Sequence, residues 1–501
     1  MERKRIFSGI IVFGVLLALL FTAVPMRPMA ASAYVKSMTV SKTSVSMDAG
    51  SSKKVKVTVK TKGKASNKIT AKSTDGTVAA VKVGKTKGNK TTVTIKGKGE
   101  GIATVIVKSK GANKKGRTLK KKITVQVSEA EDIYDDLPTY EGASPSAVIA
   151  SELYSGFTDD SFVFSPYSII DCMTLGYEGL SDTAKKALED MGITADGIAT
   201  LEAFDTLCKK DDTINVANKI YVNNIFADMF NTDLIRKDSS ELVDMNADTV
   251  QKINSWIAEQ TNDKIQNLIP ESAINEDTAM AFVNAVWMKR AWSSYMEMHD
   301  KEIEWQGDGK THGAFGGDIG TWNVKDTGGV SVVRLPYERE NNNQVQLSMY
   351  IITEDETGAK TPDEWIAGNP DLSAALDFDD YSGLTDYTDV IATIPNFKIE
   401  NKLDMTEAIK NTGLGALFGD EAFSKIGPME IDSIFHGAYI KVDKDGTEAA
   451  AATVMMAGVT SIREPVIRYI NIDKPFIYII KEETYGNILF MGRVDTDGLS
   501  D

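Results

Sequence analysis

The sequence predicts two folded parts, a small all-β domain followed by a larger domain that mixes strands and helices. Charge separates them: residues 35–128 carry about 24 Lys and Arg against about 3 Asp and Glu, whereas the chain from 129 onward carries about 28 against about 67. The first part shows the two-residue alternation of short strands. The second combines a strand pattern at 214–222 with a helical pattern near 253–265. A chain of 501 residues is long enough for two or three such domains.

The N-terminus has the form of an export signal over residues 1–33. Three basic residues at 3–5 precede an apolar run over 6–24, and the small residues Ala-Ser-Ala follow at 31–33. We expect cleavage after Ala33 and a secreted, extracellular protein, either released or associated with the cell surface. Because the apolar run is about as long as a membrane span, an uncleaved N-terminal anchor is the alternative.

Residues 34–128 are predicted to form an all-β sandwich of short strands separated by turns. The segment resembles the bacterial immunoglobulin-like domains of group 2 in its opening MTVSKTSVSMDAGSSKKVKVTV, its central STDGTVAAV and the later GIATV. The clearest alternating strands are Val55–Val59, Thr92–Ile95, Ala103–Val107 and Ile123–Val127.

The lysines of this domain indicate the class of its partner. Residues 35–128 contain no aromatic side chain that could stack on bases, which argues against nucleic acid. The simplest interpretation is a solvated face. As a hypothesis, the domain is a spacer whose positive field holds it against anionic polymers of a bacterial cell envelope. An acidic linker, residues 129–143, leads to the second domain at 144–501.

The second domain contains a series of short motifs in a fixed order. The motifs are SPYSI at 165–169, FVNAVWMK at 282–289 with Trp292, LPY at 335–337, IPNFK at 394–398, FH at 435–436 and FMGRV at 490–494. Together they resemble the serpin family over some 355 residues. The resemblance implies the α+β serpin fold, with large mixed β-sheets, about eight or nine helices and an exposed reactive loop.

The segment that follows Gly446 is unusual for a soluble protein. Residues 447–461 contain one charge, Glu448, and neither an aromatic residue nor a proline. Taken alone, this window also fits a buried helix or strand of an ordinary core, because exposed segments of this composition promote aggregation. As a strand, it would turn Thr447 and alternate small residues inward and Glu448 to solvent.

The same segment resembles the serpin hinge, whose pattern is Gly, Thr or Ser, Glu and then small residues. The matching residues are Gly446, Thr447, Glu448, Ala449, Ala450, Ala451 and Ala452. The family usually has a Glu two positions before the glycine, where this chain has Lys444. The resemblance also assigns structural roles at the shutter and breach regions of the fold to Ser165, Ser168, Asn284, Trp292 and His436, with His436 in a strand of the main sheet.

Motifs for an enzyme are missing. The three histidines are His299, His312 and His436, and there is no G-x-S-x-G, H-E-x-x-H, Walker or CxxC motif. His436 as a general base is the alternative to its structural role. We therefore expect no catalysis, no metal and no cofactor. A glycosaminoglycan cofactor is not expected either, because no basic cluster occurs between 188 and 214.

The function that the resemblance implies is suicide inhibition of a serine protease by a monomer. Counting fifteen residues from Gly446 places the scissile bond at Thr460-Ser461, with Val459-Thr460 as the alternative. The small uncharged residues before this bond fit elastase-like enzymes, whereas cleavage after Arg463 would suit a trypsin-like enzyme. The competing interpretation is a non-inhibitory, serpin-like surface or adhesion protein.

Overall fold

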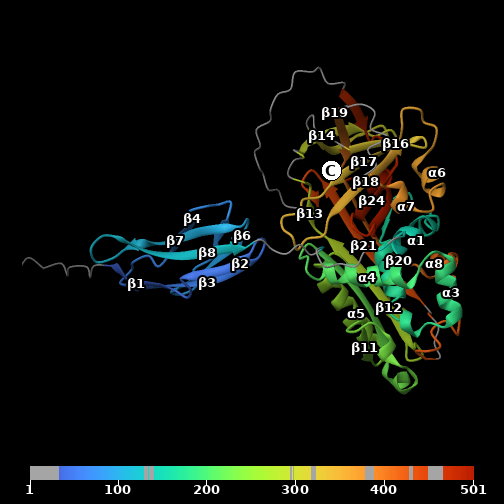
Figure 1. Ribbon diagram of the computed structural model, residues 1–501, viewed down its shortest axis with the longest axis horizontal. Coiled ribbons are helices and arrows are strands. Elements are labelled where there is room, and N and C mark those ends of the chain that lie inside the picture. Colours follow the sequence, from blue (N-terminus) through green and yellow to red (C-terminus); the bar gives the residue numbers. More distant parts are fainter. Residues whose placement is uncertain are drawn as a thin grey trace, which may run out of the picture. The chain divides into compact units, whose positions relative to one another are not determined.

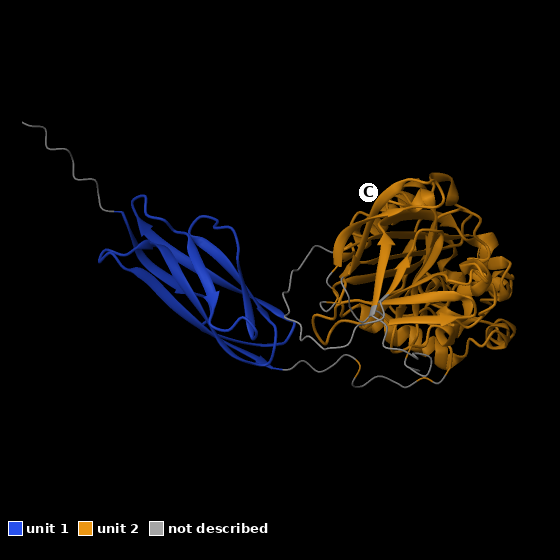
Figure 2. Cartoon of the chain, turned by 90° about the horizontal axis from the view of Figure 1, so that it is seen from above, with its two compact units in different colours: residues 1–128 blue, residues 129–501 orange. Residues whose placement is uncertain are grey.

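The computed structural model of the chain divides into two compact units, Met1–Ser128 and Glu129–Asp501 (Figure 2). The structure describes residues 33–128, 134, 140, 142–293, 296, 298–317, 323–378, 389–427, 431, 433–448 and 467–500. Within these residues, no helix combines the length and the apolar character needed to cross a bilayer.

Unit 1 consists of two four-stranded sheets, ordered β1-β3-β6-β5 and β2-β8-β7-β4, which enclose one core. In β3, Val55, Val57 and Val59 are buried in this core, while Lys54 and Lys56 are exposed, because successive side chains point to opposite faces of a strand. The predicted strands are present, and the group 2 immunoglobulin-like assignment stays a prediction. The strands are β1 (Tyr34–Val40), β2 (Ser44–Asp48), β3 (Ser52–Lys62), β4 (Ile69–Ser73), β5 (Ala79–Val83), β6 (Lys90–Gly97), β7 (Gly101–Ala112) and β8 (Thr118–Ser128).

Unit 2 is built on three sheets (Figure 1). The main sheet has the order β11-β10-β12-β21-β22-β13, with β20 also paired to β21. A second has the order β16-β17-β18-β24-β25-β9, and a third β14-β15-β19-β23. The strands are β9 (Phe162–Phe164), β10 (Ile214–Asn223), β11 (Ser240–Val243), β12 (Met280–Met288), β13 (Arg290–Ala291), β14 (Met298–Glu304), β15 (Thr311–Gly317), β16 (Asn323–Thr327), β17 (Val330–Pro336), β18 (Leu347–Glu354), β19 (Asp389–Pro395), β20 (Phe397–Asp404), β21 (Ile434–Asp443), β22 (Gly446–Thr447), β23 (Ile467–Asn471), β24 (Phe476–Glu482) and β25 (Ile488–Val494).

Eight α-helices occur in the described part of unit 2. The strand predicted at 214–222 is β10, but the helix predicted near 253–265 ends earlier, at Gln260. Asn262 and Asp263 adopt left-handed φ values of 53° and 60°, which a continuing α-helix does not allow. The helices are α1 (Pro145–Tyr154), α2 (Pro166–Met173), α3 (Asp182–Asp190), α4 (Ala195–Cys208), α5 (Ala247–Gln260), α6 (Pro362–Ala367), α7 (Leu372–Ala375) and α8 (Thr406–Lys410).

The main sheet is buried on both faces. On one face, Phe282 and Val286 of β12 belong to the large core of unit 2, which includes α1 and α2. On the other face, Val283 of β12 packs in a separate cluster with Ile253 and Ile257 of α5. Residues at the centre of this sheet are therefore buried whichever way they point, a condition that determines the environment of the hinge.

Candidate functional site

The main sheet is closed at one end and divided at the other. β12 and β21 run parallel and pair directly from Phe282–Ile434 to Val286–Ala438. Beyond this point the two strands separate, and β22 lies between their ends. Thr447 pairs with Val442 on one side and with Arg290 of β13 on the other. The first two residues of the hinge thus already occupy a strand position between β21 and the continuation of β12.

The glycine at the start of β22 is required by its surroundings. Gly446 has a φ of 132°, and a Cβ built on it would lie 2.2 Å from the carbonyl oxygen of Arg290. Glycine is the residue that tolerates both this backbone conformation and so close an approach to a neighbouring strand. The match to the family pattern at this position therefore has a local steric cause.

Thr447 points into the core, in agreement with the alternation of the hinge. Its side chain is buried, and its hydroxyl lies 2.6 Å from the hydroxyl of Tyr337. Trp292 stacks on Tyr337 with ring centroids 4.7 Å apart, and its indole N–H donates to the carbonyl oxygen of Asp443 at 2.9 Å. Trp292 therefore belongs to the pocket that receives the hinge threonine.

Glu448 does not face solvent, contrary to the prediction. Its side chain is only 5% exposed; one carboxylate oxygen lies 2.8 Å from the Lys264 ammonium and the other accepts a 2.9 Å hydrogen bond from the Trp287 indole N–H. The alternation was right in sending Glu448 to the opposite face from Thr447. That face, however, is covered by α5 and the turn after it, which carries Lys264.

Glu448 is the last described residue of the hinge. The Glu448 backbone N–H donates to the Lys441 carbonyl oxygen at 3.1 Å, but the φ of Glu448 is left-handed at 53°, so β22 ends at Thr447. Lys444, the departure from the family pattern, forms an ion pair with Asp300 of β14. The remaining predicted residues, Ala449–Ala452 of the hinge and Val459, Thr460 and Ser461 at the reactive bond, lie outside the described residues.

Four of the predicted site residues lie together where β12 and β21 pair directly with each other. The Ser165 backbone N–H donates to His436 Nε2 at 3.0 Å, and His436 Nδ1 is hydrogen-bonded to the side-chain oxygen of Asn284. The Ser168 N–H donates to Ser165 Oγ at 3.0 Å, which caps α2. Trp292 is not part of this group, since it lies at the hinge.

This geometry makes His436 a structural residue. Burial lowers its pKa to about 3, so the ring is neutral, with Nε2 as acceptor and Nδ1–H as donor. Both ring nitrogens are therefore engaged, and the serine contact is to a backbone N–H rather than to a hydroxyl. No Ser–His pair of the kind that activates a nucleophile exists at this position.

The sequence analysis missed the polar residues behind this cluster. Asn218 of β10 lies in register with Asn284, accepts a 3.0 Å hydrogen bond from Ser168 Oγ and donates to Asp171 at 2.7 Å. Arg236 completes the chain through a 2.6 Å contact with Asp171. A polar residue inside the predicted strand at 214–222 was the available signal.

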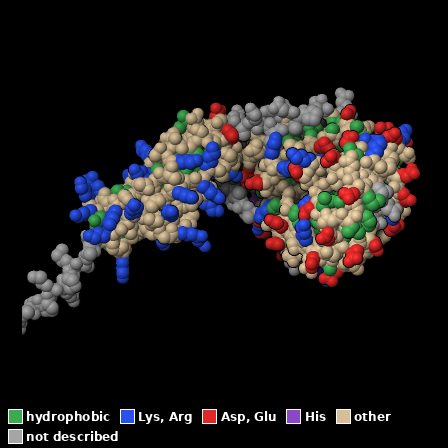
Figure 3. Space-filling view, turned by 90° about the horizontal axis from the view of Figure 1, so that it is seen from below, with side chains coloured by type: hydrophobic (Ala, Val, Ile, Leu, Met, Phe, Trp, Pro, Cys, Tyr) green, Lys and Arg blue, Asp and Glu red, His purple; other side chains and the backbone are tan. Residues whose placement is uncertain are grey.

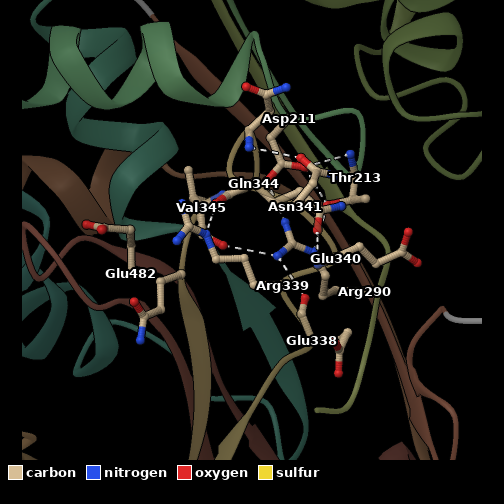
Figure 4. Close-up of polar contacts among 12 residues, drawn as sticks. Asp211, Thr213, Arg290, Glu338, Arg339, Glu340, Asn341, Gln344, Val345 and Glu482 are labelled. Carbon is tan, nitrogen blue, oxygen red and sulfur yellow. Dashed lines mark hydrogen bonds and ion pairs between the residues drawn. The ribbon is translucent and has the colours of Figure 1, made fainter. Parts of the chain in front are cut away.

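A buried ion pair adjoins the hinge, and it too was missed. The Arg290 side chain, 3% exposed, lies 2.5 Å from the Asp211 carboxylate, which is fully buried (Figure 4). Arg290 also donates to Thr213 Oγ1 at 2.8 Å and to the Val345 carbonyl oxygen at 3.0 Å. The Val345 N–H in turn donates to Asp211 at 3.0 Å.

We call Arg290, Asp211, Thr213 and Val345 the arginine hub. It joins the segment before β10, the strand that pairs with Thr447 and the loop between β17 and β18, so the partner strand of the hinge is fixed to the body of the domain. No sequence pattern signals this pair, because Arg290 and Asp211 are 79 residues apart. The described residues hold no group of three or more His, Cys, Asp or Glu side chains suited to a metal ion.

The chain matches the family model described as serpin (serine protease inhibitor) over residues 146–496. An uncharacterized serpin-like protein of Methanosarcina acetivorans is 27% identical over 401 residues, which cover 72% of this chain and 89% of that protein. Serpin-Z1A of Triticum aestivum is 25% identical over 365 residues, which cover 66% of this chain and 88% of the wheat protein.

Solved structures show the same fold. The thermophilic serpin tengpin in its native state matches with a TM-score of 0.56 and 21% identity, covering 75% of this chain and 100% of that one. An Arabidopsis serpin in its native stressed conformation matches with a TM-score of 0.54 and 22% identity, covering 70% and 95%. At these identities the similarity is one of fold.

Proposed function

Because the chain belongs to the serpin family, we propose that it is a suicide-substrate inhibitor of serine proteases that works by inserting its cleaved loop into the main sheet. The observation that supports this is the state of β22. Two hinge residues are paired on both sides at the divided end of the sheet, while β12 and β21 remain paired below them. Glu448 has a left-handed φ of 53°, so insertion requires this residue to become extended, and a strand that then continues from Thr447 would follow the seam between β12 and β21.

The chemistry comes from the protease and the energy from the fold. The protease serine attacks the carbonyl carbon of Thr460, the Thr460-Ser461 bond breaks, and the leaving amine takes its proton from the protease histidine. The ester that remains ties the protease to the new end of the loop. If about 14 residues then insert at roughly 3.3 Å each, the protease is carried about 45 Å along the sheet. A distorted protease cannot hydrolyse the ester.

Insertion of the loop as a strand would replace the single hydrogen-bond ladder between β12 and β21 by two ladders, one on each side of the new strand. The direct pairing of β12 with β21 spans five residue pairs, and a strand placed between them pairs with both along its length. Each additional hydrogen bond contributes on the order of 1 kcal/mol net, and buried methyl groups add to that. Residues 449–460 contain no charge and no proline, so none of them would resist burial or interrupt the ladder.

Thr447→Arg is the sharpest test of insertion. Thr447 occupies a closed pocket against Tyr337, so an arginine there would place an unpaired charge in the core at a cost of several kcal/mol. We expect the intact protein to form a covalent adduct with elastase that survives denaturing electrophoresis, and the variant to be cleaved without one.

Thr206→Arg, on the exposed surface of α4, is the matched control and should keep the adduct. An adduct of normal yield from Thr447→Arg would rule out insertion for this chain. Cleavage of the unsubstituted protein without an adduct would instead favour the non-inhibitory surface protein.

The proposed target class is elastase-like. Gly458, Val459 and Thr460 precede the bond and suit a small apolar pocket, whereas a trypsin-like pocket would keep its buried aspartate unpaired. Mass spectrometry of the C-terminal fragment tests the position: a start at Ser461 or Thr460 supports it, and a start at Glu464 would indicate Arg463 and a trypsin-like target.

We also propose that inhibition takes place outside the cell, on the basis of the signal-like residues 1–33. The test is the N-terminal sequence of the protein recovered from culture. A mature chain that begins at Tyr34 supports export and cleavage, while a retained Met1 at the membrane would indicate the anchor.

A further inference from the structure

The lysines of unit 1 are arranged by its sheets. In the sheet β1-β3-β6-β5, the inward positions of β3 and β6 pair apolar or small residues, such as Val55 opposite Val93, except for the exposed Lys53 near the start of β3. The intervening positions form the outer face of the sheet. Seven lysines occupy this face: Lys54, Lys56, Lys60, Lys62, Lys82, Lys90 and Lys96.

No carboxylate lies on the four strands that form this face. Unit 1 has three acidic residues between 34 and 128, and none lies on the four strands of this sheet: Asp48 ends β2, and Asp75 and Glu100 lie between strands. Figure 3 shows the resulting contrast, with many Lys and Arg side chains on unit 1 and many acidic ones on unit 2. The like charges together create a positive potential over this face, which attracts a polyanion.

Hydroxyl groups fill the positions between the lysines. Lys54 is opposite Thr94, Lys56 is opposite Thr92 and Lys90 is opposite Thr58. Lys54 and Lys56 are two residues apart, so their Cα atoms are separated by roughly 6.6 Å, and the next strand lies about 4.8 Å away. Lysine ammonium groups and Ser or Thr hydroxyls are among the side chains that contact phosphate oxygens without reading bases.

The face also lacks the means to read a base or to grip a single planar anion. The only aromatic residue between 34 and 128 is Tyr34, at the first position of β1, and the only arginine is Arg117, outside this sheet. Surfaces that bind single-stranded nucleic acids stack bases on aromatic rings, and bidentate recognition of planar anions uses arginine. A regular field of lysines suits instead a flexible chain of repeating single charges.

We propose that this outer face, which we call the lysine face, binds a linear, base-free polymer of phosphodiester groups at the outer surface of a cell. Such binding would hold the inhibitor where proteases reach that surface. It is independent of the reactive loop, because it uses unit 1 alone.

The experiment measures binding of the full chain to a synthetic poly(glycerol phosphate) at several salt concentrations. The lysine-face variant changes Lys54, Lys56, Lys82 and Lys90 to Gln. The matched control changes Lys72, Lys108, Lys120 and Lys122 to Gln, which removes the same charge from the other sheet. Melting curves of both variants check that unit 1 remains folded.

We expect the lysine-face variant to bind at least about tenfold more weakly. Its plot of log K against log salt should be less steep, with a slope smaller in magnitude by about three, since four charge contacts are lost. The control should change affinity less than about threefold. Equal losses in both variants would show that net charge alone acts and would overturn the assignment to this face. Equal or tighter binding of polyglutamate, oligothymidylate or anionic lipid vesicles would overturn the choice of partner.

Discussion

The arginine hub predicts a large effect from one substitution, Arg290→Met. The variant keeps much of the side-chain volume but leaves the fully buried Asp211 without its cation. It also removes the hydrogen bonds that Arg290 donates to Thr213 Oγ1 and to the Val345 carbonyl oxygen. Breaking a buried ion pair from one side costs about 3–5 kcal/mol, so we expect a loss of this size in the free energy of unfolding of unit 2.

Tryptophan fluorescence during urea unfolding is the appropriate assay. All six tryptophans lie after residue 250, so the signal reports unit 2 and not unit 1. Lys289→Met is the matched control, because it removes the same charge from the neighbouring exposed position and should cost less than about 0.5 kcal/mol.

A double-mutant cycle with Asp211→Leu completes this test. The double variant no longer buries an unpaired charge, so its loss should be smaller than the sum of the two single losses by about 2 kcal/mol or more. A loss below 1 kcal/mol for Arg290→Met, or additive losses in the cycle, would refute the view that the pair fixes β13 to the body of the domain.

Three further predictions concern the same sheet and its neighbours. Gly446→Ala should block pairing of β22, since its Cβ would lie 2.2 Å from the Arg290 carbonyl oxygen, and should lower adduct yield with elastase severalfold, whereas unchanged yield would contradict the steric argument. Glu448→Gln should lose the ion pair with Lys264 but keep an acceptor for Trp287, so we expect a small loss of stability of about 1 kcal/mol. Because 1 M salt screens the ion pair of the unsubstituted protein, it should reduce the difference in stability between the two proteins, and a difference that salt leaves unchanged would contradict this assignment. Burial raises the pKa of Glu482 from 4.5 to about 7, so the folded state holds a proton that the unfolded state releases between these values, and the free energy of unfolding should fall by about 3 kcal/mol as pH rises through that window. Glu482→Gln should remove this decline in urea unfolding at pH 4.5–8, and an unchanged decline would assign it to other groups.

Features that depend on neighbouring residues in the chain were predictable. The alternation of β3 and β6 comes from the two-residue period of a strand, and it predicted both the buried valines and the exposed lysines of unit 1. The hinge was recognisable because a left-handed glycine, a small residue that fits a closed pocket and an uncharged run are each properties of single residues or short windows. The order of the motifs predicted the serpin fold.

Features that depend on what lies across the sheet were not predictable. Period 2 places Glu448 on the face opposite Thr447, but only the packing of α5 and Lys264 over that face makes it buried. Trp292 belongs to the same family motif as Asn284, but the two residues lie at different places along the sheet. Asn284 contacts His436, whereas Trp292 lies at the hinge.

The sequence by itself therefore determined the strand alternation, the charge of each domain, the glycine at the hinge and the family, because local sterics and residue type are sufficient for these. Only the tertiary structure decided the pairing of Arg290 with Asp211, the burial of Glu448 and the extent to which β22 enters the sheet. The physical reason is that ion pairing and burial depend on which surfaces meet in space, and residues 79 positions apart carry no local mark of the contact they will make.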